Sequence, residues 1–195
     1  MRLRPVVFAL FVVACAPLVH AQGQSQSFSL RFSGPPGEYI SAGQSYAYDQ
    51  HNASLDFGEV GGGAVLFQLY SPPNGITHFW TLVLQPYPGT RLDPGVYQTA
   101  LRWPFQGQHP GLTLFGDGRG CNTSSGFFTV LSSTYSGNNL IGIHATFEQH
   151  CEGGPLALTG EINVDPVMLP AMSSELLLLL AACFAVAGVV ALRRQ

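Results

Sequence analysis

The chain has 195 residues, of which 46% are hydrophobic and only 10% are charged, and its formal net charge is −3. This length suits one domain of about 100–150 residues plus targeting segments. Residues 22–165 carry four arginines against ten acidic residues, a net charge of −6 with histidine neutral. Such a surface repels phosphate backbones, so the sequence predicts no nucleic-acid partner. The 23 glycines and 14 prolines favour short strands over long helices.

The N-terminus has the three parts of a secretory signal peptide. Met1–Arg4 is positively charged, residues 6–13 are apolar, and small residues stand at positions −3 and −1 before a cleavage site. Cleavage after Ala21 would remove residues 1–21. A competing interpretation is that residues 12–15 resemble a lipobox, in which Cys15 would be lipidated after cleavage before it. Both interpretations predict export, and the choice between them stays open.

The C-terminus predicts a membrane anchor. Residues 176–192 form an uncharged apolar run of 17 residues, the lower limit for a transmembrane helix. Two arginines follow directly, and the positive-inside rule places residues 193–195 in the cytoplasm. The expected organisation is therefore an extracytoplasmic domain at 22–165, a linker at 166–175 and a membrane helix at 176–192.

The linker and the helix together resemble a known sorting signal. A Leu-Pro-Ala-Met-Ser motif, an apolar helix and terminal arginines resemble the tripartite C-terminal signals of Gram-negative bacteria, most closely the IPTL type, a relative of the PEP-CTERM signals. The resemblance implies recognition by a sorting protease of the exosortase type. The protein would then pass from an inner-membrane-anchored intermediate to the cell surface or extracellular matrix. It departs from the usual pattern at two positions and lacks an aromatic residue after the serine. The motif residues are Leu169, Pro170, Ala171, Met172, Ser173, Arg193 and Arg194.

Alternation of apolar and polar residues predicts an all-β domain between the two ends. Turn-forming clusters of glycine, proline and asparagine separate the segments, which is typical of a β-sandwich or a β-barrel with about 8–10 strands. The predicted fold is a β-sandwich, jelly-roll-like or Greek-key. The predicted strands are Phe28–Phe32, Tyr46–Tyr48, Ser54–Phe57, Ala64–Tyr70, Phe79–Gln85, Val96–Leu101, Leu112–Phe115, Gly126–Tyr135, Leu140–His150 and Leu156–Val164.

The last long hairpin predicts a disulfide. A two-residue turn at Gly137-Asn138 pairs positions whose numbers sum to 275, and Cys121 and Cys151 sum to 272. The two cysteines should therefore lie nearly opposite at the open end of the hairpin and be oxidised in an exported protein. In the second strand, Ile141, Ile143, Ala145 and Phe147 are expected to face the core.

Three segments of this domain also resemble a recurrent pattern in exported bacterial domains of no established activity. They are the Gly-Pro-Pro-Gly-Glu-Tyr-Ile opening at 34–40 and the two cysteine segments Gly116–Asn122 and Phe147–Gly154. The resemblance implies a modular domain and names no ligand. For Arg119, the expected partner is Asp117 or Glu152.

The sequence contains no nucleophile elbow, Walker loop, EF-hand or paired zinc-ligand motif, and it predicts no cofactor. His144, Glu148 and His150 share one strand face and are weak candidates for a metal site, although a solvated polar face is the favoured interpretation. Trp80 is expected in the core. Trp103 and Phe105, in a loop rich in proline and glycine, and Tyr87 are candidates for a ligand platform.

Two functions are compatible with these features. The favoured one is a non-catalytic surface or matrix protein, adhesive or polysaccharide-binding, exported and sorted through the membrane. The alternative is a secreted hydrolase whose carboxylates come from separate strands, because glycoside hydrolysis requires no local motif.

Overall fold

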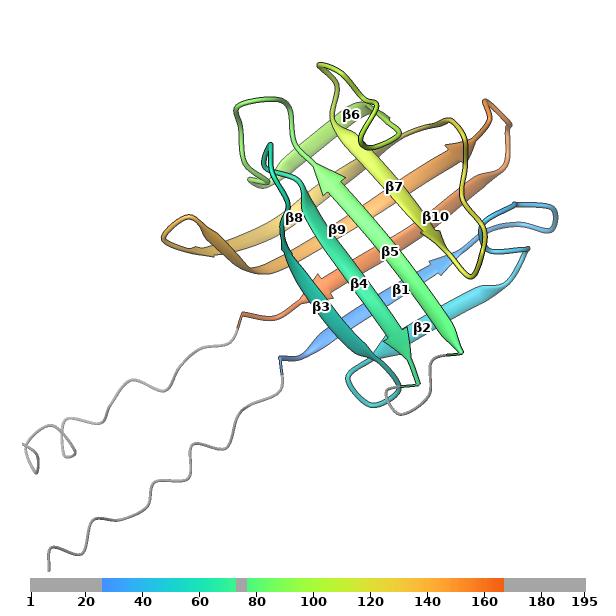
Figure 1. Cartoon of the computed structure of the whole chain (residues 1–195), viewed down its shortest axis with the longest axis horizontal. Coiled ribbons are helices and arrows are strands. Elements are labelled where there is room, and N and C mark those ends of the chain that lie inside the picture. Colours follow the sequence, from blue (N-terminus) through green and yellow to red (C-terminus); the bar gives the residue numbers. More distant parts are fainter. Residues whose placement is uncertain (1–25, 73–76, 167–195) are drawn as a thin grey trace, which may run out of the picture.

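The computed structural model describes residues 26–72 and 77–166, which form ten strands and no helix (Figure 1). One continuous sheet runs in the order β2-β1-β10-β9-β8-β6-β7-β5-β4-β3. Neighbouring strands are antiparallel, except that β6 and β7 are parallel. The strands are β1 (Phe28–Ser33), β2 (Ser45–Asp49), β3 (Ser54–Glu59), β4 (Val65–Ser71), β5 (His78–Gln85), β6 (Gly95–Leu101), β7 (Gly111–Gly116), β8 (Ser124–Ser136), β9 (Asn139–Cys151) and β10 (Ala157–Val164).

Every segment predicted from alternation forms a strand, so the prediction of an all-β domain with eight to ten strands is confirmed. The sheet order shows which strands are neighbours, which the alternation of residues does not reveal. β2 and β3 form the two ends of the sheet although a short turn joins them, in which the amides of Asn52 and Ala53 donate to the carbonyl oxygen of Asp49. The sheet must therefore curl until its ends meet.

The curled sheet encloses the hydrophobic core between two facing layers. In Figure 1, strands β3, β4, β5 and β7 lie in front of the other strands and run across them. The indole nitrogen of Trp80 on β5 donates to the hydroxyl oxygen of Tyr48 on β2 at 3.0 Å, which links the two layers inside the core. Trp80 is fully buried, as predicted from its apolar surroundings in the sequence.

The alternation of residues decides which face of each strand is buried. On β4, Val65, Phe67 and Leu69 are buried, whereas the residues between them are only half-buried. On β10, Gly160 permits a close approach, since a Cβ atom there would lie 2.3 Å from the ring of Phe147 on β9. Packing of this density leaves little room for larger side chains.

The β8–β9 hairpin has the predicted register at both ends. Ser136 pairs with Asn139 and Ser124 pairs with Cys151, while two opposite register shifts along β8 cancel between them. Cys121 and Cys151 form a disulfide with a Cα–Cα distance of 5.2 Å, so this prediction is confirmed. The predicted inward face needs one correction: Leu140 joins the core in place of Ile141, because a register shift near the turn changes the alternation there.

The open edge of β7 is completed by a side chain. β7 has a single pair with β6, between Gly111 and Leu101, and no further strand partner on that edge. Beyond it, the buried amide of Gln149 on β9 accepts from the backbone nitrogen of Leu114 at 2.7 Å and donates to its carbonyl oxygen at 3.1 Å. The Gln149 amide therefore takes the place of one residue of a neighbouring strand.

The opening motif at 34–40 is a structural loop between β1 and β2. The buried carboxylate of Glu38 accepts hydrogen bonds from the amide of Ile40 at 2.9 Å and from the amide and hydroxyl of Ser41 at 2.6 Å. Gly34 is required because a Cβ atom there would lie 2.6 Å from the Cγ atom of Glu38. This motif therefore has a role in folding, with its polar groups paired within the loop.

Several predictions concern residues outside the described ranges. These are the signal peptide at 1–21 with Cys15, most of the linker at 166–175 with its sorting motif, the helix at 176–192 and the tail at 193–195. Among residues 26–72 and 77–166, there is no helix long and apolar enough to cross a membrane.

Candidate functional site

The loop between β6 and β7, residues 102–110, is held on the sheet by hydrogen bonds at both ends and along its length. The amide of Leu101 donates to the carbonyl oxygen of Pro110 at 2.9 Å, which closes the base of the loop. The amide of Trp103 donates to the hydroxyl oxygen of Thr113 at 3.0 Å, and the side-chain amide of Gln106 donates to that of Gln85 at 2.7 Å. The loop is therefore positioned before any ligand arrives, which lowers the entropic cost of binding.

Two cavities share Arg102 and Asn122 as lining residues. One has a volume of about 300 Å³ and includes Trp103 and Phe115, and the other has a volume of about 470 Å³ and includes Phe105. We call these two cavities together the Arg102 groove. Each is in the size range of small-ligand sites in proteins.

Phe105 gives the Arg102 groove an exposed aromatic surface. Its side chain is 72% exposed, the largest exposed fraction among the large hydrophobic residues of the described part of the chain. The guanidinium carbon of Arg102 lies 4.9 Å from the centre of the Phe105 ring, a cation–π arrangement. Trp103 is half-buried and faces the smaller cavity. Two of the three predicted platform residues therefore lie in one groove.

Tyr87, the third predicted platform residue, lies elsewhere. It belongs to neither cavity of the Arg102 groove and stacks against Tyr97 at a centroid distance of 6.1 Å. Its hydroxyl donates to the carbonyl oxygen of Gln98. Tyr87 is exposed, so it stays a candidate aromatic surface that is separate from the Arg102 groove.

Arg102 differs from two other arginines of the domain in lacking a carboxylate partner. Arg91 pairs with Asp93 at 2.8 Å, and Arg119 lies 4.0 Å from Asp117. Within residues 26–72 and 77–166, the side chain of Arg102 forms no hydrogen bond or ion pair, and its Nε atom is buried without an acceptor. Sequence reasoning missed this residue, because only the fold shows which arginines meet acids.

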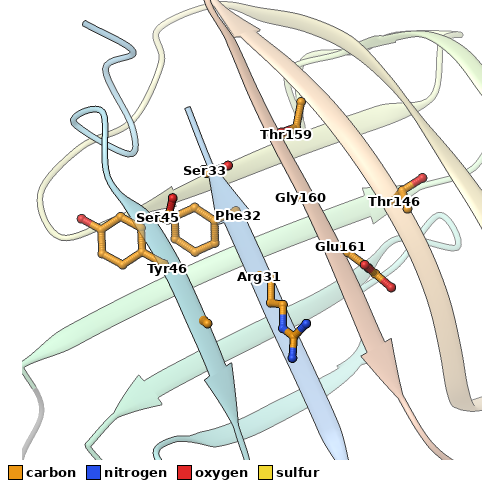
Figure 2. Close-up of a pocket in the computed structure, with 10 residues that line it drawn as sticks. Arg31, Phe32, Ser33, Ser45, Tyr46, Thr146, Thr159, Gly160 and Glu161 are labelled. Carbon is orange, nitrogen blue, oxygen red and sulfur yellow. The ribbon is translucent and has the colours of Figure 1, made fainter. Parts of the chain in front are cut away.

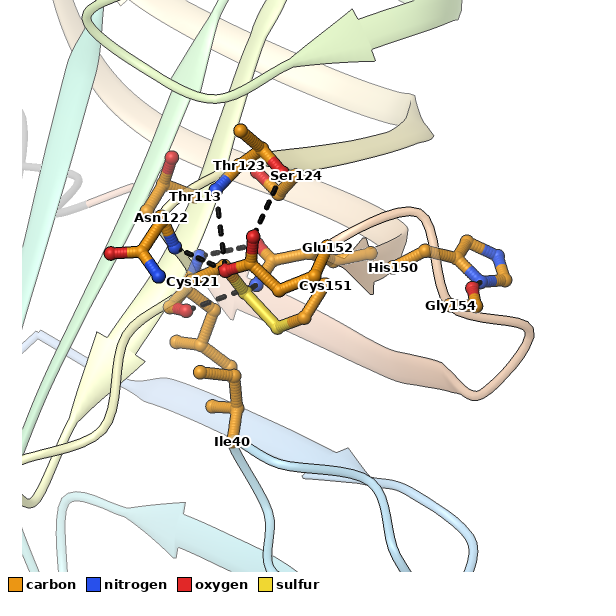
Figure 3. Close-up of a disulfide and its surroundings, with 12 residues drawn as sticks. Ile40, Thr113, Cys121, Asn122, Thr123, Ser124, His150, Cys151, Glu152 and Gly154 are labelled. Carbon is orange, nitrogen blue, oxygen red and sulfur yellow. Dashed lines mark hydrogen bonds between the residues drawn. A yellow bond between two sulfur atoms is a disulfide. The ribbon is translucent and has the colours of Figure 1, made fainter.

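The part of the groove formed by Asn122 and Thr123 is held in place by the Cys121–Cys151 disulfide and by Glu152 (Figure 3). The Glu152 carboxylate accepts from the amide of Asn122 at 2.5 Å and from the hydroxyl of Thr123 at 3.0 Å. The hydrogen bond from the Asn122 amide, followed by those from Thr123, lowers the pKa of Glu152 below its ordinary value. The segment after Cys121 is thus fixed by one covalent bond and several hydrogen bonds.

The weak metal candidates do not converge in the structure. His144 contacts Glu161 of β10 at 2.6 Å, while His150 contacts Glu148 at 3.0 Å. No group of three metal-ligating side chains is found among the described residues. A shallow cavity of about 440 Å³ on the same outer face is lined by Arg31 and Glu161 and by small side chains such as Ala47 (Figure 2). Its two aromatic residues, Phe32 and Tyr46, are buried and half-buried, whereas Phe105 is exposed.

A polar cluster that the sequence did not predict lies at the start of β5. The Nδ1 atom of His78 lies 2.5 Å from the Oδ2 atom of Asp117, and the Oδ1 atom of Asp117 accepts from the amide of Phe79 at 3.0 Å. Arg119 donates to the hydroxyl oxygen of Tyr46 at 3.2 Å and lies over the Trp80 ring. The cluster ties the β7–β8 loop to β2 and β5, and Asp117 is the nearer of the two acids expected for Arg119.

None of the three cavities described above is lined by two carboxylates, the pair that glycosidases use. Glu161 lines the shallow cavity, and neither cavity of the Arg102 groove is lined by a carboxylate. The Arg102 groove presents an aromatic face, a guanidinium and polar groups held by backbone hydrogen bonds. No protein-family model matches the chain, and neither a curated protein nor a solved structure matches it.

Proposed function

We propose that this chain is an exported surface or extracellular-matrix protein whose β domain binds polysaccharide without catalysis through the Arg102 groove. The observation that carries the proposal is the exposed ring of Phe105 on a loop that hydrogen bonds already hold in place. Sugar rings have apolar C–H faces that pack on aromatic rings, and their hydroxyls pair with polar groups such as those of Arg102 and Asn122. The groove combines both kinds of group.

The proposal includes the class of fold. The two facing layers are assigned to the β-sandwiches of jelly-roll-like or Greek-key type, which include lectin domains. The parallel contact between β6 and β7 departs from the antiparallel pattern of those folds. An experimental structure in which the sheet order differed from that described above would overturn the assignment.

Replacing Phe105 with alanine should weaken polysaccharide binding by about tenfold, since the loss of one aromatic contact is worth roughly 1.4 kcal/mol. The measurement is retention of the purified full chain, in detergent, on a panel of immobilised polysaccharides. Leu131→Ala is the matched control, because Leu131 is 50% exposed and lies on β8 about 23 Å from Ser124 at ~3.3 Å per residue.

Equal retention of the Phe105→Ala and Leu131→Ala variants would show that the groove is not the binding site. The same panel tests the alternative function. Release of new reducing ends, abolished by substitution of a single aspartate or glutamate, would establish a hydrolase in place of a binding domain.

The proposed route to the surface rests on the two ends of the chain. Deletion of 169–195 should move the protein from the membrane fraction into the medium, because it removes the proposed sorting motif and apolar helix. The measurement is immunoblotting of both fractions. A deleted chain that stays in the membrane fraction would instead favour the lipidated Cys15, and Cys15→Ser in that background would then release it.

A further inference from the structure

We infer that the Arg102 groove selects sugars that carry a carboxylate, such as uronates, and that Arg102 is the residue that recognises it. This inference rests on the proposed polysaccharide binding and specifies its ligand. The guanidinium of Arg102 has no carboxylate partner among the described residues, whereas those of Arg91 and Arg119 each have one. The Nε atoms of Arg102 and Arg119 are both buried without an acceptor among the described residues, but only Arg119 has a described carboxylate within 4.0 Å of its guanidinium.

The position of Arg102 prepares it for an anion. Its guanidinium carbon lies 4.9 Å from the centre of the Phe105 ring, and its own amide is fixed by a hydrogen bond to the carbonyl oxygen of Ser124 at 3.1 Å. Stacking on a ring restricts the plane of the guanidinium while its edge stays available for hydrogen bonds. That edge matches a carboxylate, which accepts two parallel hydrogen bonds from it.

Glu152, which holds Asn122 and Thr123 of the groove, does not pair with Arg102. The Glu152 carboxylate is engaged by the amides of Asn122 and Thr123 and by the Thr123 hydroxyl. It forms no ion pair with Arg102, whose side chain lies farther than 4.0 Å from every described carboxylate. The described residues thus leave the Arg102 guanidinium available to a carboxylate of a ligand.

The charge of the domain sets the kind of acidic sugar. Residues 22–165 have a net charge of −6, so a densely sulfated chain is repelled over its length. A carboxylate that meets Arg102 locally gains a charge-assisted hydrogen bond while the rest of the sugar packs on Phe105. The fit is best for a glycan with spaced uronates whose other residues are neutral.

The experiment compares acidic polysaccharides with their carboxyl-reduced forms, which differ only at the carboxylate. For the full chain in detergent, carboxyl reduction should weaken binding by about 10- to 100-fold, the range for hydrogen bonds to a charged group. Arg102→Gln should remove this preference, so that the acidic and the carboxyl-reduced forms bind this variant with equal affinity. Arg102→Lys should keep part of it, because lysine retains the charge but lacks the planar fork.

Arg31→Gln is the matched control, since Arg31 on β1 lines the shallow cavity outside the Arg102 groove and no described carboxylate lies within 4.0 Å of its guanidinium (Figure 2). It should leave the preference intact. A wild-type preference that survives in Arg102→Gln, or equal binding of acidic and reduced forms by the wild type, would overturn the inference while the proposed function stands. Stronger binding of heparin than of any uronate would overturn it as well. If no polysaccharide binds, the proposed function fails too.

Discussion

Replacing Cys121 and Cys151 with alanine should lower the free energy of unfolding of the domain by about 3–4 kcal/mol. The disulfide closes a loop with a sequence separation of 30, and a loop of that length restricts the unfolded chain by about this amount in the chain-entropy model. Alanine is the suitable replacement because Cys121 is buried and a hydroxyl would lack a partner there. The measurement is urea denaturation followed by circular dichroism.

The control for this prediction is the wild-type protein under reducing conditions, whose stability should match that of the double-alanine variant. A loss below about 1 kcal/mol would mean that the hairpin register and the Glu152 hydrogen bonds already restrict this segment in the unfolded chain. The double variant should also bind polysaccharide more weakly, because Asn122 and Thr123 follow Cys121 directly in the groove wall.

Replacing Gln149 with methionine should destabilise the domain by roughly 2–5 kcal/mol, although the two side chains have similar volumes. Methionine cannot pair with the backbone nitrogen and carbonyl oxygen of Leu114, and Leu114 is fully buried. Each buried backbone group left without a partner costs about 1–3 kcal/mol. Urea denaturation of the oxidised protein measures the loss directly.

Gln98→Met is the matched control, because the Gln98 side chain on β6 is exposed and forms no hydrogen bond with another described residue. Its effect should stay within about 0.5 kcal/mol. Equal stabilities of the two variants would mean that water or a shift of β7 replaces the hydrogen bonds of the Gln149 amide. The Gln149 side chain would then not be needed to pair the open edge of β7.

The sequence was informative about local structure because β alternation and turn residues act over short distances. The ten strands, the Gly137-Asn138 turn and the Cys121–Cys151 disulfide all follow from patterns within one strand or one hairpin. The order of the strands does not, since it depends on pairings between distant segments such as β1 and β10. The sequence predicted Ile141 in the core, whereas the structure places Leu140 there. Only the structure shows this, because one register shift moves a residue to the other face of the strand.

The candidate site was predictable only in part for the same reason. Trp103 and Phe105 stand out because aromatic residues in a loop rich in proline and glycine have little core to enter. The isolation of Arg102 from acids, the burial of Gln149 and the pairing of His78 with Asp117 are properties of the folded arrangement. No spacing in the sequence encodes them.

The pairing of β1 with β10 has a consequence for the order in which the domain assembles. Phe28 lies opposite Val164, so the first strand of the domain acquires this neighbour only after almost the entire domain is available. If the chain is exported as proposed and emerges N-terminus first, one edge of β1 has no strand partner until β10 emerges. The β8–β9 hairpin, whose strands are adjacent in the chain, is free of this delay. Completion of the sheet thus falls to the last strand to emerge.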